Sequence, residues 1–196
     1  MSSRKFKALQ NQIRDCKICL HDLPVEPNPV VQINPNATIL IAGQAPGRKV
    51  HETGIPFNDA SGNRLREWMG VDKTIFYDPN IVAILPMGFC FPGTGKSGDL
   101  PPRKECAEKW RNKVLSQLPN IKLTLLIGQY AMKWHLGKAM QKTLTSTVEN
   151  WKDYLGNQFP LPHPSPRNYG WLKKNSWFEE SVIPDLKVRI KAVLEN

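Results

Sequence analysis

The sequence predicts an α/β fold, a three-layer αβα sandwich with a central, mostly parallel four-stranded sheet. Short apolar runs rich in β-branched residues recur along the chain, and segments with helical patterning separate them. Loops rich in glycine and proline follow the runs. Alternating strands and helices of this kind form a parallel sheet that helices cover on its faces.

Three of the expected strands can be placed along the chain. The first is the run TILIA at residues 38–42, which ends at Gly43. The second is IVAIL at residues 81–85, and the third is LTLLIG at residues 123–128. Each run lacks charged residues and is bounded by turn-forming residues, as buried strands are.

Helical segments alternate with these strands. Ser61 is expected to cap the start of one helix and Gly70 to end it, because serine favours the N-cap and glycine the left-handed C-terminal position. The last helix is expected to begin near Pro184, since proline suits a first helical turn. The predicted helices span residues 4–15, 61–69, 104–118, 129–137 and 181–194.

Three long segments between these elements are predicted loops, at residues 22–36, 43–57 and 86–103. Two of them leave the carboxyl ends of strands, where parallel sheets bind their ligands. Gly93–Ser97 resembles the end of a phosphate-binding P-loop, but Cys90 stands where that motif needs glycine. A flexible basic loop that contacts a phosphate backbone is the better prediction for this segment.

Length and composition predict one globular domain, residues 1–196. The chain has 27 basic and 17 acidic residues and a formal net charge of +10. Such a surplus predicts nucleic acid, an anionic membrane surface or an acidic ligand as partner. No apolar run reaches the length of a membrane span. Residues 1–14 lack the apolar core of a secretory signal, so a cytoplasmic location is expected.

The four cysteines are not expected to form structural disulfides in a reducing compartment. Cys16 and Cys19 form a CxxC pair, a spacing that lets two thiolates reach one metal or cluster. Cys90 and Cys106 follow, with fifteen residues between them. The pattern predicts a cluster or zinc site, with buried, inactive thiols as the alternative.

The segment LPHPSPRN at residues 161–168 is the most unusual of the chain. Its three prolines exclude a helix interior or a central strand and favour a stiff, extended loop. His163 and Arg167 in such a loop could act next to a polyanion, although a surface connector is the simpler alternative. We expect this loop to form a third wall of the pocket beside Gly43–Gly47 and Pro86–Gly98.

The order of these motifs resembles the uracil-DNA glycosylase superfamily over about residues 14–190. A strand is followed by Gly43–Gly47 (GQAPG), then by Pro56-Phe57, Ser61-Gly62 and the late HPSP loop. The first segment is similar to the GEAPG motif of the iron–sulfur family four. The late loop is closer to that of the single-strand-selective monofunctional uracil-DNA glycosylases. The four cysteines fall where family four carries its [4Fe–4S] ligands.

The resemblance implies roles for several residues. Phe57 would stack on the base, and His163 would donate a hydrogen bond to the base O2 as the glycosidic bond breaks. The turn from Pro164 to Arg167 would press into the minor groove. The remaining substrate-binding residues would be Gly43, Ala45, Ser165 and Asn168.

The water-orienting group is a separate hypothesis, in which Gln44 or Asp59 positions the attacking water. Gln44 stands where family four has a glutamate, and Ala45 matches the aspartate of family one. The asparagine that reads uracil in several families has no evident counterpart near residues 84–88. The residues therefore leave the identity of the base open. Uracil is the default base that the resemblance implies, with hypoxanthine, xanthine or an oxidised pyrimidine as rivals.

The predicted function is that of a monofunctional DNA glycosylase in base excision repair, a monomer that acts on a damaged base in single- or double-stranded DNA. The missing acidic residues leave a second function open, the binding of damaged or single-stranded DNA without turnover. A third alternative is an RNA-binding protein that uses the same basic surface.

Overall fold

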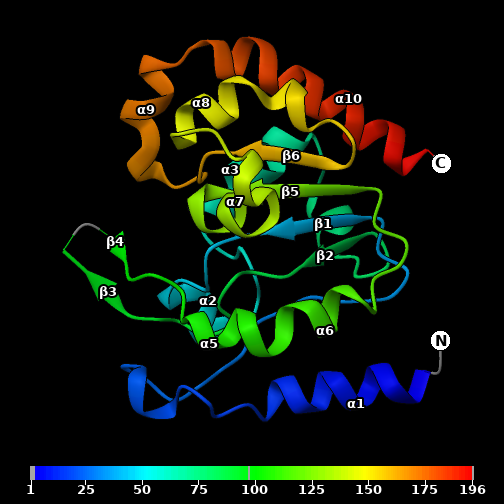
Figure 1. The fold of residues 1–196 in the computed structure, drawn as a ribbon, viewed down its shortest axis with the longest axis vertical. Helices are drawn as coiled ribbons and strands as arrows, with labels where there is room; N and C mark the ends of the chain where they lie inside the picture. The colour runs from blue at the N-terminus through cyan, green and yellow to red at the C-terminus, as the bar shows by residue number, and fades with distance from the viewer. Residues whose placement is uncertain (1–2, 97, 196) are drawn as a thin grey trace.

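The computed structural model describes residues 3–96 and 98–195 and confirms the predicted α/β class. Its central sheet holds four parallel strands in the order β2-β1-β5-β6, with helices flanking it (Figure 1). The strands are β1 (Ile39–Ala42), β2 (Val82–Ile84), β5 (Leu123–Ile127) and β6 (Gln158–Leu161).

The strand order reverses beside β1. Ile39 of β1 pairs with Val82 of β2 on one side and with Leu123 of β5 on the other. After β1 the chain therefore moves outward to β2 and then returns past β1 to build β5 and β6. At such a switch point the loops diverge and leave a crevice beyond the carboxyl ends of the strands.

Alternate residues of β1 face two different cores. Ile39 and Ile41 belong to the core that also contains residues of α3 (Ala60–Met69) and α10 (Ile183–Leu194). Leu40 belongs to the second core, which α1 (Ser3–Arg14) and the helical segment around Trp110 complete. Because strand side chains alternate between faces, an uncharged strand such as β1 can bury both of its faces.

The start of α3 differs from the prediction. The N-cap is Asp59, whose carboxylate accepts a hydrogen bond from the Gly62 amide at 2.9 Å, while Ser61 is buried inside the first turn. A carboxylate satisfies a free amide and also interacts favourably with the helix dipole, so the helix begins two residues earlier than Ser61 predicts. The predicted end is confirmed, because Gly70 is left-handed with φ of 67°.

Other helices also differ in their bounds. The expected loop at 43–57 contains α2 (Arg48–Thr53), and the expected helix at 104–118 is divided by a π-helical turn over Ala107–Arg111. Pro184 does lie in the first turn of α10. The remaining helices are α4 (Lys73–Phe76), α5 (Lys104–Cys106), α6 (Asn112–Leu115), α7 (Gly128–Leu136), α8 (Leu144–Glu149) and α9 (Tyr169–Lys174).

Two strand features were not placed by the sequence patterns. β6 contains Pro160 and lies at the sheet edge, where a missing backbone donor is tolerated. The expected loop at 86–103 contains an antiparallel hairpin of β3 (Thr94–Gly95) and β4 (Gly98–Asp99), which projects from the body of the protein (Figure 1). Within the described residues, no helix has the length and apolar character needed to cross a membrane.

Candidate active site

A pocket of about 350 Å³ opens at the carboxyl edge of the sheet. The loops that follow β1, β2 and β6 border it, as does the hairpin, so the three loops expected to converge do meet there. The residues singled out from the sequence that line it are Gly43, Gln44, Ala45, Phe57, Asp59, His163, Ser165 and Arg167. Asn168 is not a lining residue; its side-chain amide donates to the His163 carbonyl at 2.7 Å and so braces the late loop.

The ring of His163 is oriented by its own loop. The Ser165 amide donates to Nδ1 at 3.2 Å, so a neutral ring carries its hydrogen on Nε2. Burial lowers the pKa of His163, while the charges of Asp59 and Asp99 oppose this shift. The result is a neutral imidazole that lines the pocket with Nε2–H as its donor.

Phe57 has a backbone φ of 53°, the one positive value among the described residues other than glycine. Its carbonyl oxygen accepts hydrogen bonds from the Tyr77 hydroxyl at 3.3 Å and from Arg66 at 3.5 Å. The ring meets Phe76 edge-on, with centroids 6.1 Å apart. These contacts hold the ring of Phe57 in the pocket wall despite the unfavourable backbone conformation.

Two glycines make room for this arrangement. A Cβ added to Gly62 would stand 1.7 Å from the Phe57 carbonyl oxygen, so only glycine fits there. A Cβ added to Gly43 would meet the tip of the Phe57 ring at 3.5 Å, which shows that the ring lies directly over the first motif. The two motifs that the sequence separates by about a dozen residues are thus in contact.

The backbone of the first motif is fastened to the loop that follows β2. The carbonyls of Gly43 and Gln44 accept from the amides of Met87 and Gly88 at 2.8 and 2.9 Å. The side-chain amide of Gln44 donates to the Leu100 carbonyl at 3.1 Å, so it also holds the base of the hairpin.

The late loop and the hairpin meet at the rim of the pocket. A Cβ added to Gly98 would lie 2.6 Å from a guanidinium nitrogen of Arg167, which therefore rests against the hairpin backbone. Arg64 of α3 donates to the Ser165 carbonyl at 3.3 Å. The rim thus joins elements from three distant parts of the chain.

Sequence patterns missed two charged residues near the pocket. Asp99 on β4 lines it, but a lone aspartate in a segment expected to be loop gave no signal. Arg111 is fully buried and donates to the carbonyls of Leu85 and Pro86, each at 3.0 Å, beneath the pocket floor. The helical pattern of residues 104–118 did not distinguish this arginine from the exposed basic residues around it.

The four cysteines lie together in a second, smaller pocket, and all four are free thiols. Among the residues that the structure describes, no three Cys, His, Asp or Glu side chains are arranged to hold a metal ion. Burial raises the pKa of Cys90 to about 11 and that of Cys106 to about 12, and it also raises the pKa of Cys19.

Each of the four sulfurs accepts one N–H hydrogen bond. The Trp110 indole donates to Cys16 and the Phe89 amide to Cys106, both at 3.3 Å. Arg103 donates to Cys19 and the Asn28 amide to Cys90. Hydrogen bonds of this kind stabilise sulfur that carries negative charge, as it does in a thiolate bound to metal.

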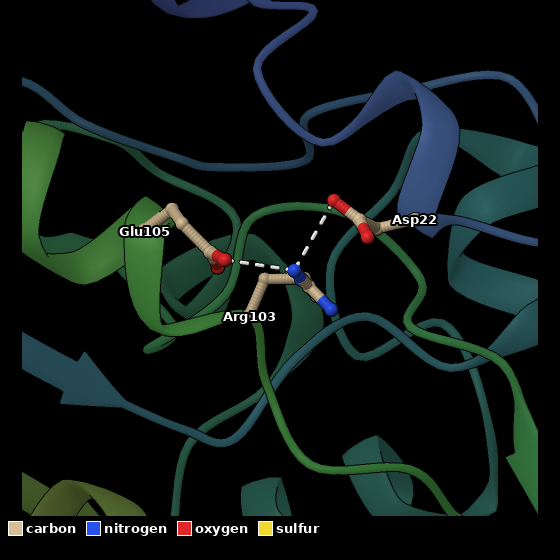
Figure 2. Close-up of polar contacts among 3 residues, drawn as sticks. All are labelled: Asp22, Arg103 and Glu105. Carbon is tan, nitrogen blue, oxygen red and sulfur yellow. Dashed lines mark hydrogen bonds and ion pairs between the residues drawn. The ribbon is translucent and has the colours of Figure 1, made fainter.

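Arg103 also ties together the two segments that carry these cysteines. Figure 2 shows its guanidinium between Asp22, which follows the CxxC pair, and Glu105, which precedes Cys106. The N–O distances are 3.2 Å to Asp22 and 2.7 Å to Glu105. The ion pairs are exposed to solvent, so their contribution to stability is small.

Comparison with known protein families places this chain in one of them. The family model of the uracil DNA glycosylase superfamily matches residues 30–187, which include the sheet, the main pocket and the late loop. The match covers most of the 196 residues. It agrees with a pocket that combines an aromatic wall, a neutral imidazole donor and carboxylates beside the first motif. This chain therefore belongs to the uracil DNA glycosylase superfamily and is a DNA glycosylase-like enzyme.

Proposed function

We propose that this protein is a monofunctional DNA glycosylase that hydrolyses the N-glycosidic bond of uracil, or of a related deaminated or damaged base, in base excision repair. The observation that carries the proposal is the pairing of Phe57 with the neutral Nε2–H of His163 in one pocket. A base that is flipped out of the helix needs a stacking wall and a donor at the atom where charge collects.

In the proposed mechanism the flipped base stacks on Phe57, and His163 donates from Nε2 to the base O2. As the bond between C1′ and the base nitrogen breaks, its electron pair moves onto the base, and the hydrogen bond strengthens with the growing negative charge. The lowered pKa of His163 supports this role, because a neutral ring donates without first losing a proton to the departing base.

Water must then attack C1′, which carries positive charge in the transition state. Gln44 and Asp59 are the candidates that the sequence motifs offer for orienting this water, and both line the pocket. Each also has a structural contact, Gln44 to the Leu100 carbonyl and Asp59 to the Gly62 amide. Their single alanine variants would separate the two candidates, and full activity in both would exclude this hypothesis.

Uracil is the default substrate in this proposal, with hypoxanthine, xanthine and an oxidised pyrimidine as rivals. The net charge of +10 supports binding to the phosphate backbone of DNA, and Arg167 at the pocket rim is the proposed contact in the minor groove. Proteins that carry out this chemistry on nuclear or bacterial DNA work in a reducing compartment, which agrees with four free thiols.

The test is base release from oligonucleotides that each carry one of these bases, with wild-type protein and His163→Ala. We expect the His163 variant to release the preferred base at least about 100-fold more slowly, as for loss of a hydrogen-bond donor to the developing negative charge. His21→Ala, which changes an exposed histidine outside the pocket, is the matched control. Unchanged turnover in His163→Ala would remove its assigned role. Tight binding without release of any base would favour the non-catalytic DNA binder.

We also propose that Cys16, Cys19, Cys90 and Cys106 hold a [4Fe–4S] cluster. The residues fit this group, since four free thiols share one pocket and each sulfur has an N–H donor. A single zinc would draw four sulfurs to about 3.8 Å from one another, as its Zn–S bond length requires. When bound, the cluster would supply iron–thiolate bonds that join the N-terminal segment to the loop after β2.

Metal analysis and colour test the cluster. We expect purified protein to be brown, with absorbance near ~400 nm and iron and sulfide in equal amounts, as for cysteine-ligated clusters. Cys106→Ser should lower the iron content and the colour, whereas His21→Ala should leave both unchanged. If the protein contains one zinc per chain and has no colour, the four cysteines form a zinc site and not a cluster site.

A further inference from the structure

The β3–β4 hairpin brings to the pocket a carboxylate that is not part of the sequence motifs. The chain leaves the sheet after β2, passes Cys90, forms the hairpin, and returns through Arg103 to Cys106. Asp99, the last residue of β4, lines the pocket beside the first motif. The hairpin projects from the body of the protein, so its base rather than its tip reaches the pocket (Figure 1).

The Asp99 carboxylate lies over the first motif. A Cβ added to Gly47 would stand 3.4 Å from Asp99 Oδ2, so this oxygen faces the GQAPG loop. The other oxygen, Oδ1, accepts from the Thr94 hydroxyl at 3.4 Å across the hairpin. The charge of Asp99 also reaches His163, whose pKa it raises against the larger effect of burial. Asp99 is thus near both the first motif and His163, the proposed hydrogen-bond donor.

The two pocket aspartates differ in what they already bind. Asp59 uses Oδ1 to cap α3 at 2.9 Å from the Gly62 amide, in a strong geometry next to a helix N-terminus. Within the described residues, the Asp99 carboxylate makes a long hydrogen bond to Thr94, and Asp99 is exposed to the pocket and to solvent. A carboxylate oxygen that already caps a helix is less free to bind a water molecule than one that faces the pocket.

The base of the hairpin is held in place from two sides. The Leu100 amide donates to the Gly93 carbonyl at 2.8 Å, and the Leu100 carbonyl accepts from Gln44. On the other side, Gly98 has φ of 140° and leaves room for the guanidinium of Arg167. Gln44 therefore links the first motif to the residue that follows Asp99, which positions the carboxylate relative to that motif.

We propose that Asp99 is a catalytic residue that orients and deprotonates the attacking water. This inference rests on the proposed glycosylase function. The oxygen of the water forms the new bond to C1′ while the bond from C1′ to the base breaks and its electron pair leaves with the base. One water proton passes to the Asp99 carboxylate and then to solvent or the base anion, so the products are the free base and an abasic sugar. Asp99 in this way supplies the carboxylate that Gln44 and Ala45 lack.

The test compares Asp99→Asn, Asp99→Glu and Asp153→Asn with the wild type. Asp153 is exposed and outside the pocket, and it is the matched control. Single-turnover base release is measured on the best substrate of the lesion panel. Affinity is measured separately on a duplex with a 2′-fluorinated deoxyuridine, whose glycosidic bond resists hydrolysis. Thermal melting checks that each variant is folded.

We expect Asp99→Asn to release the base at least about 100-fold more slowly, as for a lost general base, with affinity within twofold of wild type. Asp99→Glu should recover part of the rate, and Asp153→Asn should match wild type. A normal rate in Asp99→Asn would overturn the inference and leave the proposed function intact. An equal loss of rate and affinity in both Asp99 variants would assign the residue a structural role instead. A wild-type protein that releases no base would refute the proposed function itself.

Discussion

At the scale of single residues, the pocket depends on an unfavourable backbone conformation of Phe57. Phe57 adopts φ of 53°, which costs a residue with a Cβ about 1 kcal/mol or more. The cost is offset by hydrogen bonds to its carbonyl oxygen from Tyr77 and the buried Arg66. Arg66 is further held by Asn63 at 2.6 Å. The aromatic wall is therefore a product of several buried contacts.

Replacing Gly62 with alanine should disrupt this wall. The new methyl group would lie 1.7 Å from the Phe57 carbonyl oxygen, so the strained turn must move. We expect a loss of at least about 2 kcal/mol in the free energy of unfolding, measured by urea denaturation. Gly156→Ala is the control, because its added Cβ would meet no heavy atom within 4 Å. Equal stability of the two variants would contradict this account of Phe57.

A second residue-scale feature is a half-buried histidine, His135, whose Nε2 cannot accept a proton. Arg111 donates to His135 Nε2 at 2.7 Å, so that nitrogen must be unprotonated. Burial, followed by the charge of Arg111, lowers the pKa of His135 to about 3. In the unfolded chain the pKa returns to its ordinary value of about 6.5.

The stability of the protein should therefore fall in mild acid. Below about pH 6.5 the unfolded chain binds a proton that the folded protein excludes, and the loss grows until the pH approaches 3. At pH 5 His135 alone should reduce the free energy of unfolding by about 2 kcal/mol relative to pH 8. Urea denaturation of wild type and His135→Gln at pH 5 and pH 8 measures this change in the free energy of unfolding. The variant should lose less stability than wild type, and an identical loss would refute this assignment.

At the scale of elements, Arg111 joins a helix to the end of a strand. It lies at the end of the π-helical turn Ala107–Arg111 and donates to the carbonyls of Leu85 and Pro86 just after β2. Burial lowers its pKa to about 10, which shows that the protein interior opposes its charge. The hydrogen bonds must offset this cost, and through them the helix supports the pocket floor.

Arg111→Met should therefore destabilise the protein. Methionine fills a similar volume but leaves two carbonyl oxygens and His135 Nε2 without their donor. We expect the free energy of unfolding to fall by about 2–4 kcal/mol, the cost of several unsatisfied buried acceptors. Arg189→Met removes a partly exposed ion pair with Asp185 and should cost about 0.5 kcal/mol. Chemical denaturation of both variants tests the difference; similar losses would mean that the carbonyl contacts contribute little.

At the scale of the whole molecule, the excess of basic residues should govern DNA affinity. With a net charge of +10, we expect binding to an oligonucleotide to weaken at least about tenfold between 50 and 200 mM salt. Arg167→Ala should reduce the slope of log Kd against log salt by about 1, as for one lost phosphate contact. Lys191 on α10 is exposed and outside the pocket, so Lys191→Ala should leave the slope unchanged. Fluorescence anisotropy over a salt series measures these slopes, and equal slopes in all three proteins would remove Arg167 from the DNA contact.

The sequence by itself determined what contiguous patterns encode. Uncharged runs predicted β1, β2 and β5, Gly70 predicted the end of α3, and the CxxC pair predicted a shared cysteine site. The meeting of the first motif with the loop that follows β2 also followed from the sequence, because parallel strands end at one edge of the sheet. These features need only local propensity and a rule of topology.

The tertiary structure alone decided which polar groups act together. Asp59 rather than Ser61 caps α3, Arg111 is buried among carbonyls, and Asp99 reaches the pocket from a hairpin. β6 forms despite Pro160 because it pairs with β5 on one side only. The physical reason is common to these cases. Burial and hydrogen bonding depend on neighbours that lie far away in the chain, and a local pattern of residues does not identify those neighbours.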